Sequence, residues 1–349
     1  MRFATHSAPH LRPPTSVSRV MFDVVAALMP GVVLYTLFFG SGVIINLALA
    51  TGAALAAEAV MLQLRGKPLA PFLQDGSAIV TGVLIALAIP PLAPWWIPVI
   101  GAAFGIIFAK HLYGGLGYNP FNPAMAGYVV LLISFPVAMT QWPAPASLVD
   151  ALPGPLQSLG IVFTGNWPQA LEMDAVTSAT PLDELKTGLA QGRTMAEIRA
   201  APIFGALGGT GWQWVNIGFL LGGIYLLYRR VIRWQIPLAT LGGLGLMALI
   251  FYIGDPDLYA SPVFHIFNGA AILCAFFIAT DPVSASTTPR GRLVYGLGIG
   301  VLIYVIRTWG GYPDAVAFAV LLMNMAVPAI DQYTRPRVYG HGKKRGSGR

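Results

Sequence analysis

The sequence predicts an all-α membrane protein that crosses the bilayer about ten times. Of its 349 residues, 56% are hydrophobic and only 10% are charged, whereas soluble domains carry about 25% charged residues. Apolar runs of about 20 residues recur along the chain, and such a run crosses a hydrocarbon core of about 30 Å as a helix. Barrel strands would instead alternate every second residue, so a helical bundle is expected.

The predicted spans follow one another closely, with one long interruption. The third and fourth are short and are separated only by Pro90-Pro91-Leu92-Ala93-Pro94, which predicts a tight hairpin turn. The ten spans comprise residues 21–39, 43–64, 77–91, 94–110, 123–141, 214–228, 234–253, 263–280, 293–306 and 312–330.

A polar segment over residues 143–212 separates the fifth span from the sixth. The predicted organisation is therefore a first transmembrane half (1–142), a small extramembrane insertion (143–212), a second transmembrane half (213–331) and a basic tail (332–349). The first part of the insertion is rich in proline and is expected to be irregular.

The distribution of Lys and Arg predicts the orientation. With the N-terminus in the cytoplasm, the cytoplasmic segments hold 17 of the 21 Lys and Arg residues. Three of the other four lie in the long insertion, where charge has little influence on topology. We therefore expect a bacterial inner-membrane protein with both termini cytoplasmic and residues 143–212 periplasmic. Topology explains the net charge of +7, and no nucleic-acid partner is expected. The tail around Lys343 is expected to contact anionic lipid or a cytoplasmic partner, and a role as a topology determinant alone is a sufficient alternative.

The two halves share an ordered set of short patterns. Asp75-Gly76-Ser77-Ala78-Ile79 opens the third span, and Asn268-Gly269-Ala270-Ala271-Ile272 lies near the start of the eighth. Gly114-Gly115 precedes the fifth span and Gly310-Gly311 precedes the tenth. Because the matched spans are five apart, their directions are opposite, which predicts an inverted five-plus-five repeat. Chance similarity among glycine-rich helices is the alternative.

The stretch 174–182, Asp-Ala-Val-Thr-Ser-Ala-Thr-Pro-Leu, is the part of the insertion that points to chemistry. Thr180 and Asp183 stand where a helix N-cap is expected, with Pro181 in the first turn. Free backbone N–H groups at a helix start attract phosphate, so a phosphate near Thr180 would lie in a favourable field. The simpler interpretation is a capping turn without further function.

This stretch resembles the flavinylation motif Asp-x-x-Ser/Thr-Gly-Ala-Thr. The resemblance implies that Thr180 carries FMN through a phosphoester, installed from FAD by a flavin transferase. It also implies that Asp174 and Thr177 are recognition or metal-supporting positions for the transferase. Ser178 stands where glycine is commonest in the motif, which is a departure from the pattern.

Three further stretches, 114–125, 280–284 and 307–315, resemble the NqrB/RnfD family of membrane subunits from Rnf and sodium-pumping NADH:quinone oxidoreductase complexes. The length is nearer to the RnfD type. The resemblance implies a subunit that relays electrons through covalent FMN while the complex couples ferredoxin and NAD chemistry to Na⁺ or H⁺ movement. The implied partners are the other Rnf subunits, among them a second flavinylated subunit and a NAD-binding subunit.

Asn119 and Asn122 lie in a Gly- and Pro-rich stretch at the cytoplasmic edge. Non-helical backbone is tolerated at this depth where it lines a cavity, so these amides are candidate ligands of a second flavin, which in NqrB-like relatives is riboflavin. A turn that starts the fifth span is the equal alternative.

Ionisable residues inside the predicted spans are candidate sites because a charge in the bilayer is costly. Glu58 is the most interior of them. Its candidate roles are an ion or proton ligand and the partner of a neighbouring helix. His111 is expected at the interface, tryptophans at span ends as anchors, and the single cysteine, Cys274, in packing. No residues with metal-ligand spacing are evident. The other candidates are Asp23, His265, Asp314 and Asp331.

Two functions compete with an electron relay. An inverted repeat alone favours a channel or secondary transporter without a cofactor. A structural assembly subunit is a third possibility. The 174–182 stretch favours the relay, because a transporter has no evident use for it.

Overall fold

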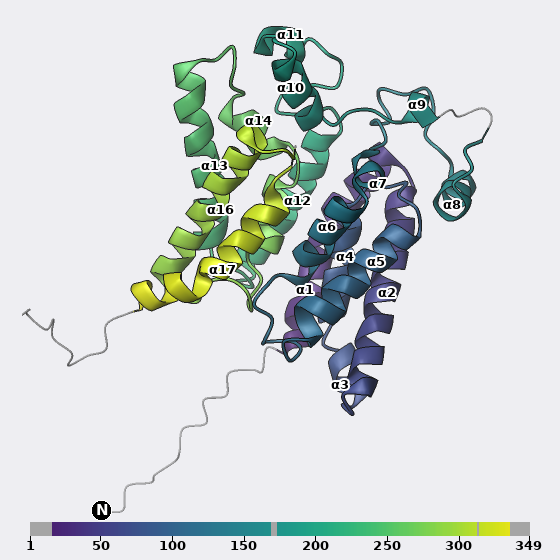
Figure 1. Cartoon of the computed structure of the whole chain (residues 1–349), viewed down its shortest axis with the longest axis vertical. Coiled ribbons are helices and arrows are strands. Elements are labelled where there is room, and N and C mark those ends of the chain that lie inside the picture. Colours follow the sequence, from purple (N-terminus) through teal and green to yellow (C-terminus); the bar gives the residue numbers. More distant parts are fainter. Residues whose placement is uncertain (1–15, 169–172, 313, 336–349) are drawn as a thin grey trace, which may run out of the picture.

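The computed structural model describes residues 16–168, 173–312 and 314–335, without the side chains of Asp174 and Ala175. Its long helices run side by side, and short helices gather at one end of the bundle, called the upper end here (Figure 1). The first half contains α1 (Val17–Phe39), α2 (Gly42–Leu64), α3 (Leu69–Leu73), α4 (Ser77–Ala88), α5 (Trp96–Phe104), the π-helical η1 (Gly105–His111), α6 (Pro123–Ser134) and α7 (Pro136–Thr140). The insertion contains α8 (Pro155–Thr164), α9 (Met173–Val176), α10 (Pro181–Ala190) and α11 (Met195–Arg199). The second half contains α12 (Trp212–Tyr228), α13 (Gln235–Gly254), α14 (Pro262–Phe267), α15 (Ala271–Leu273), the π-helical η2 (Cys274–Ile278), α16 (Pro289–Trp309) and α17 (Val316–Thr334).

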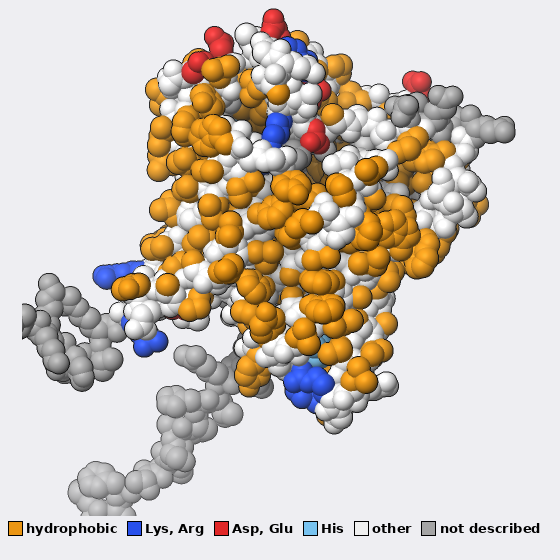
Figure 2. All heavy atoms as spheres, viewed as in Figure 1, with side chains coloured by type: hydrophobic (Ala, Val, Ile, Leu, Met, Phe, Trp, Pro, Cys, Tyr) orange, Lys and Arg blue, Asp and Glu red, His pale blue; other side chains and the backbone are white. Residues whose placement is uncertain are grey.

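Five of these helices, α1, α2, α13, α16 and α17, are each long and apolar enough to span a membrane unaided. Hydrophobic side chains cover the middle of the visible face, as expected of a surface in contact with lipid (Figure 2). The prediction of an all-helical membrane fold is confirmed. The number of ten crossings stays a prediction, because the remaining apolar helices of the described residues are shorter.

Several predicted spans are divided into shorter helices. The eighth is broken at Asn268–Ala270, between α14 and α15. The fifth is interrupted at Phe135, where Pro136 starts α7, because proline cannot supply the N–H that continues a helix. The proline-rich start of the insertion, expected to be irregular, contains α8 with Pro155 in its first turn, a position that suits proline.

The two halves meet where α1 packs along α12. Glycines make this approach possible: a Cβ placed on Gly222 would lie 1.8 Å from the carbonyl oxygen of Ala27, and one on Gly218 would lie 2.8 Å from the Cα of Gly31. Small residues let helix backbones approach closely in membranes. The helix contact between the halves therefore depends on glycines, which have no side chain to hold the helices apart.

The inverted repeat is visible in the backbone. In each half a short helix, α3 or α14, leads into an Asx-Gly pair before the next helix. Both glycines have left-handed backbone angles, with φ of +80° at Gly76 and +60° at Gly269, a region open to glycine. Figure 1 places α3 at the lower end of the bundle and α14 at the upper end, as an inverted repeat requires.

Both described ends of the chain lie at the lower end of the bundle, whereas the insertion lies at the upper end (Figure 1). On the visible face, Asp and Glu gather at the upper end and most Lys and Arg at the lower end (Figure 2). The predicted orientation depends on this unequal distribution of charge between the two ends. The expected contributions of Arg2, Arg12 and the tail from 336 onward lie outside the described residues.

Candidate functional site: a cavity below the insertion

The 174–182 stretch is held against the start of the insertion. An antiparallel bridge joins Pro143 and Thr177. The backbone N–H of Ser178 donates to the carbonyl of Trp142 (3.0 Å), and Ala144 N–H donates to the Val176 carbonyl (2.8 Å). These bonds place the chain just before Thr180 over the upper end of the bundle.

Thr180 is the N-cap of α10, as predicted. Its hydroxyl accepts a hydrogen bond from the backbone N–H of Asp183 (3.2 Å) and donates to that residue's carboxylate (2.6 Å). Of the other motif residues, Thr177 donates its hydroxyl to the carbonyl of Met173 (2.9 Å) and Ser178 is half-buried. The side chain of Asp174 lies outside the described part of the structure.

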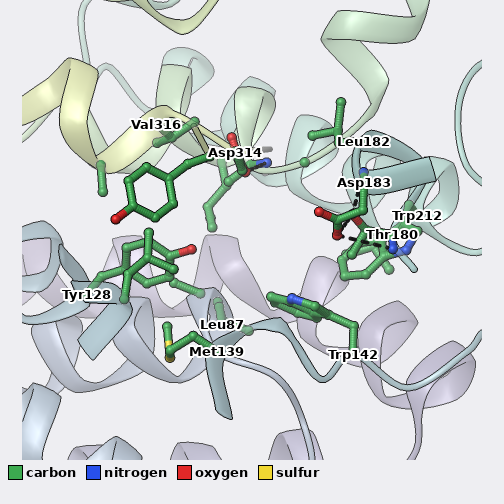
Figure 3. A pocket seen from close by; sticks show the side chains of 18 of the residues that line it. Leu87, Tyr128, Met139, Trp142, Thr180, Leu182, Asp183, Trp212, Asp314 and Val316 are labelled. Carbon is green, nitrogen blue, oxygen red and sulfur yellow. Dashed lines mark hydrogen bonds between the residues drawn. The ribbon is translucent and has the colours of Figure 1, made fainter. Parts of the chain in front are cut away.

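Thr180 lies at a cavity of about 140 Å³ between the two halves, called the upper cavity here (Figure 3). The walls are mainly apolar and aromatic. Trp142 and Trp212 lie with their rings 5.3 Å apart at 70° on the side of Thr180, and Tyr128 lies across the cavity. Tyr312 also lines it. Ligand sites have this character, with few polar groups in an apolar wall.

A fully buried polar atom of the lining has no bond. The hydroxyl of Tyr35 is buried without a hydrogen-bond partner among the described residues, although buried tyrosine hydroxyls usually find one. Asn216, in contrast, is used by the fold, since its amide donates to the carbonyls of Trp212, Phe267 and Gly269. Tyr35 therefore gives the apolar wall a buried hydroxyl without a partner among the described residues.

The break in the eighth span forms one side of this cavity and is braced by side chains. Arg307 donates to the carbonyls of His265 (2.7 Å) and Asn268 (3.1 Å) and contacts Asp314 (3.2 Å). Asp314 accepts the N–H of Ala270 (2.9 Å). Backbone groups left free by a helix break must be satisfied within the protein at membrane depth, and these charged groups meet that need.

A lysine of the insertion fastens α10 to the second half. The ammonium of Lys186 donates to the carbonyls of Gly310 and Tyr312, next to the start of α17. Burial lowers the pKa of Lys186, and the nearby Asp183 carboxylate opposes that shift. Leu182 and Leu185 of the same helix pack against Phe264. The wall that carries Thr180 is thus anchored to α14 and to the start of α17.

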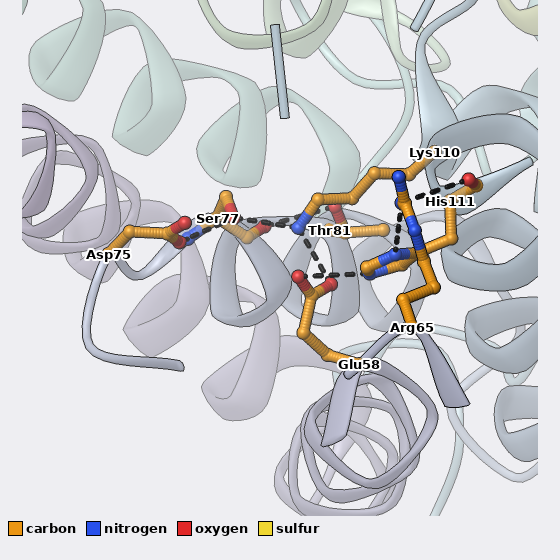
Figure 4. Close-up of polar contacts among 7 residues, drawn as sticks. All are labelled: Glu58, Arg65, Asp75, Ser77, Thr81, Lys110 and His111. Carbon is orange, nitrogen blue, oxygen red and sulfur yellow. Dashed lines mark hydrogen bonds and ion pairs between the residues drawn. The ribbon is translucent and has the colours of Figure 1, made fainter. Parts of the chain in front are cut away.

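A second polar cluster, unexpected in its extent, lies at the lower end around Glu58 (Figure 4). Glu58 forms an ion pair with Lys110 (2.7 Å) and lies 3.1 Å from Nε2 of His111, all with side chains 2% exposed. Lys110 also donates to the hydroxyl of Ser77 (2.8 Å), which donates to Asp75 (2.5 Å). Glu58 thus pairs with a neighbouring helix, one of the two roles considered for it, and its role as an ion or proton ligand stays a prediction. His111 is buried in the protein, and its position at the membrane interface stays a prediction.

A smaller cavity of about 110 Å³, the lower cavity, adjoins this cluster. Asn119 and Asn122 both line it, as predicted, but they differ in use. The Asn122 side chain caps α6 by accepting from the N–H groups of Ala124 and Met125. The side-chain oxygen of Asn119 is buried without a partner among the described residues. Asn122 therefore has the structural role, and Asn119 is free to bind a ligand.

The two cavities occupy equivalent positions in the inverted repeat. The upper cavity is lined by Gly269 and Ala270 at the break in the second half, and by Trp212 at the start of α12. The lower cavity is lined by Ser77 at the corresponding break in the first half, and by Met21 near the start of α1. The molecule thus has a similar recess at each end, beside a broken span.

The remaining predicted sites have structural partners. Asp23 lies 3.7 Å from Arg229, and the carboxylate of Asp331 accepts from Ser286 and Thr287. The His265 ring packs against that of Tyr304, and Cys274 is buried. Trp142 and Trp212, interpreted from sequence as membrane anchors, line the upper cavity instead. The sequence did contain a signal for this role, because Trp142 and Trp212 lie on either side of the insertion.

Comparison with known proteins gives one consistent result. The model of the family described as "NQR2, RnfD, RnfE family" matches residues 4–340. Proteins from Aliivibrio salmonicida and Aeromonas hydrophila are 53% and 54% identical, with 98% of this chain and 100% of each relative covered. A protein from Vibrio cholerae is 53% identical at the same coverage. All three are named as a subunit of an "Ion-translocating oxidoreductase complex". This chain, a multi-pass membrane protein, belongs to the NQR2, RnfD, RnfE family.

Proposed function

We propose that the chain is a membrane subunit of an ion-translocating oxidoreductase complex and carries FMN, esterified to Thr180, as an electron relay. The observation that carries this proposal is the position of the Thr180 hydroxyl at an aromatic cavity between the two halves. The relatives' shared name supports the assignment to such a complex.

The residues around Thr180 suit a flavin bound through its phosphate. Thr180 precedes the N-terminus of α10, which favours a negatively charged phosphate. An isoalloxazine ring is flat and largely aromatic, and Trp142 and Trp212 offer ring faces and edges of the kind that such a system packs against. The unpaired hydroxyl of Tyr35, whose ring lies beside that of Trp212, supplies a polar contact in the cavity wall.

A flavin supplies one- and two-electron transfer, which none of the side chains here provides. The protein's share is binding and orientation. Thr180 would hold one end of the cofactor, Trp142 and Trp212 would pack against its ring, and the apolar wall around Leu87 and Met139 would exclude water. Lys186 holds α10 in place over the second half, which keeps the attachment point at a constant distance from α17.

A second flavin is proposed for the lower cavity, with riboflavin as the candidate. Asn119 offers a free carbonyl oxygen there, which suits an N–H donor of a flavin ring edge. The position of this cavity beside the other broken span supports the idea, because the fold then presents a similar recess to each flavin. Asn119→Leu is expected to remove this noncovalent flavin, whereas covalent flavin on Thr180 stays.

The remaining features of the proposal follow from the family. The membrane is the bacterial inner membrane, residues 143–212 are periplasmic, and both termini are cytoplasmic. Electrons pass between this chain and other subunits, including a second flavinylated subunit and a NAD-binding subunit, and their flow is coupled to Na⁺ or H⁺ movement. A flavin transferase and lipid complete the set of partners.

The test is flavin fluorescence of the full chain in a denaturing gel after coexpression with a flavin transferase. The wild-type chain is expected to fluoresce and Thr180→Val is not. Thr194→Val is the matched control, because Thr194 is likewise a helix N-cap on the insertion, and its fluorescence should equal that of the wild type. A dark wild-type band would contradict the proposal and favour a cofactor-free channel or transporter.

A further inference from the structure

The insertion contains two helix starts of the same chemical kind. α10 begins after Thr180 with Asp183 at its third position, and α11 begins after Thr194 with Glu197 at its third position. In both, the threonine hydroxyl accepts the acid's backbone N–H, at 3.2 and 3.4 Å. The usual role of the acid is to accept the N–H of the capping threonine, and Glu197 does so at 2.8 Å.

Asp183 makes a further bond with its carboxylate. It accepts from the backbone N–H of Thr180 at 3.4 Å, which completes the same capping arrangement, and it also accepts from the Thr180 hydroxyl at 2.6 Å, as Figure 3 shows. A bond of this length between a hydroxyl and a carboxylate is charge-assisted and strong. Capping does not need this bond. The carboxylate of Asp183 therefore accepts a hydrogen bond from the hydroxyl proton that Thr180 must lose when an ester forms there.

The surroundings leave this carboxylate available. The described ion pairs near it are Arg193 with Glu184 and Arg307 with Asp314, and neither engages Asp183. The nearby ammonium of Lys186 donates to backbone carbonyls and forms no described ion pair with Asp183. The carboxylate is half-buried at the cavity. It can therefore accept a proton without first breaking a salt bridge.

We infer that Asp183 is the base that activates Thr180 for flavin attachment, an inference that rests on the proposed function. Thr180 Oγ1 gives its proton to the Asp183 carboxylate and forms a bond to the FMN phosphorus of FAD. The phosphoanhydride bond between FMN and AMP breaks, and AMP leaves with the electron pair of that bond. Nothing is oxidised or reduced. Threonine is a weak nucleophile unless an adjacent base takes its proton, and here the chain itself supplies that base.

The experiment measures the rate of attachment on the full chain, purified from cells that lack a flavin transferase. The chain is mixed with purified transferase, FAD and Mg²⁺, and the mass increase and in-gel fluorescence are followed over time. Asp183→Asn keeps the size of the side chain but removes the base, and the rate is expected to fall about 100-fold, the lower range for general base catalysis. Glu197→Gln, the matched change in the second helix start, should label at the wild-type rate.

Two further variants separate the possible outcomes. Asp183→Glu keeps a carboxylate and should label faster than Asp183→Asn. Two results would overturn the role of Asp183 as a base. One is labelling of Asp183→Asn at the wild-type rate. The other is an equal loss of labelling rate in Asp183→Asn and Asp183→Glu, which would assign Asp183 to the helix start alone. Labelling of Thr180→Val would instead overturn the proposed attachment site itself, so the two failures are distinguishable.

Discussion

At the scale of single residues, the charged groups inside this protein are paired. Lys110 and Glu58 are the clearest case, because both side chains are 2% exposed and their charged atoms lie 2.7 Å apart. Removal of one partner leaves a buried charge without compensation, whereas removal of both leaves none. The stability of the lower end should therefore depend on the pair rather than on either residue.

Lys110→Met is expected to lower the free energy of unfolding by about 3–5 kcal/mol. The double variant Glu58→Gln/Lys110→Met should recover most of that loss, since no buried charge is then left unpaired. Thermal or denaturant unfolding of the purified chain measures both. Equal stability of the single and double variants would show that the ion pair is not what the fold requires there.

The site could be predicted from sequence only where it is local. Thr180 and the start of α10 are encoded by consecutive residues, so motif and helix signals located them. The cavity wall is different, because Tyr35, Trp142 and Trp212 come from separate segments and meet only in the folded bundle. Nor does sequence indicate that Asp183 bonds the threonine hydroxyl in addition to the backbone N–H, since Asp183 and Glu197 both follow a threonine by three residues.

At the scale of helices, most long elements were predicted and the breaks were not. Hydropathy is insensitive to a break such as that at Gly269, because the residues on either side are equally apolar. Arg307 and Asn216 stabilise the break, because they satisfy its carbonyl groups from two other helices. The matching Asx-Gly pair at Gly76 was visible in the sequence, but only as a repeat and not as a change of backbone direction.

The contact between α1 and α12 gives a prediction at the same scale. Gly222→Ala places a methyl group where the Ala27 carbonyl oxygen lies, 1.8 Å from the new carbon. Backbone atoms cannot rotate away as a side chain can, so the helices must separate, at a cost of about 3 kcal/mol. Thermal unfolding of the purified chain checks this cost. Gly242→Ala on α13 is the control, because no described atom lies within 4 Å of its new carbon, and it should not lower stability.

At the scale of the whole molecule, the inverted repeat relates the two ends to each other. Lys110 precedes Gly114-Gly115 and contacts Ser77, the residue after Gly76. In the second half, Arg307 precedes Gly310-Gly311 and contacts the backbone of Asn268, the residue before Gly269. Each half therefore braces its own broken span with a buried basic residue, and each end holds one recess. The upper end differs from the lower mainly by the insertion, which covers its recess and brings the Thr180 hydroxyl to it. Orientation in the membrane consequently decides which compartment the proposed covalent flavin faces.

A pair of cysteine variants tests that orientation. Gln191 is exposed beyond the end of α10, and Gln63 is exposed near the lower end of α2. The native Cys274 is fully buried, so it contributes little background to thiol labelling. In intact cells with permeable outer membranes, a membrane-impermeant maleimide should label Gln191→Cys at once and Gln63→Cys only after lysis, because the positive charge of the lower end retains it in the cytoplasm. The reverse pattern would place Thr180 on the cytoplasmic side, and any electron acceptor of a flavin attached there would have to be sought on that face.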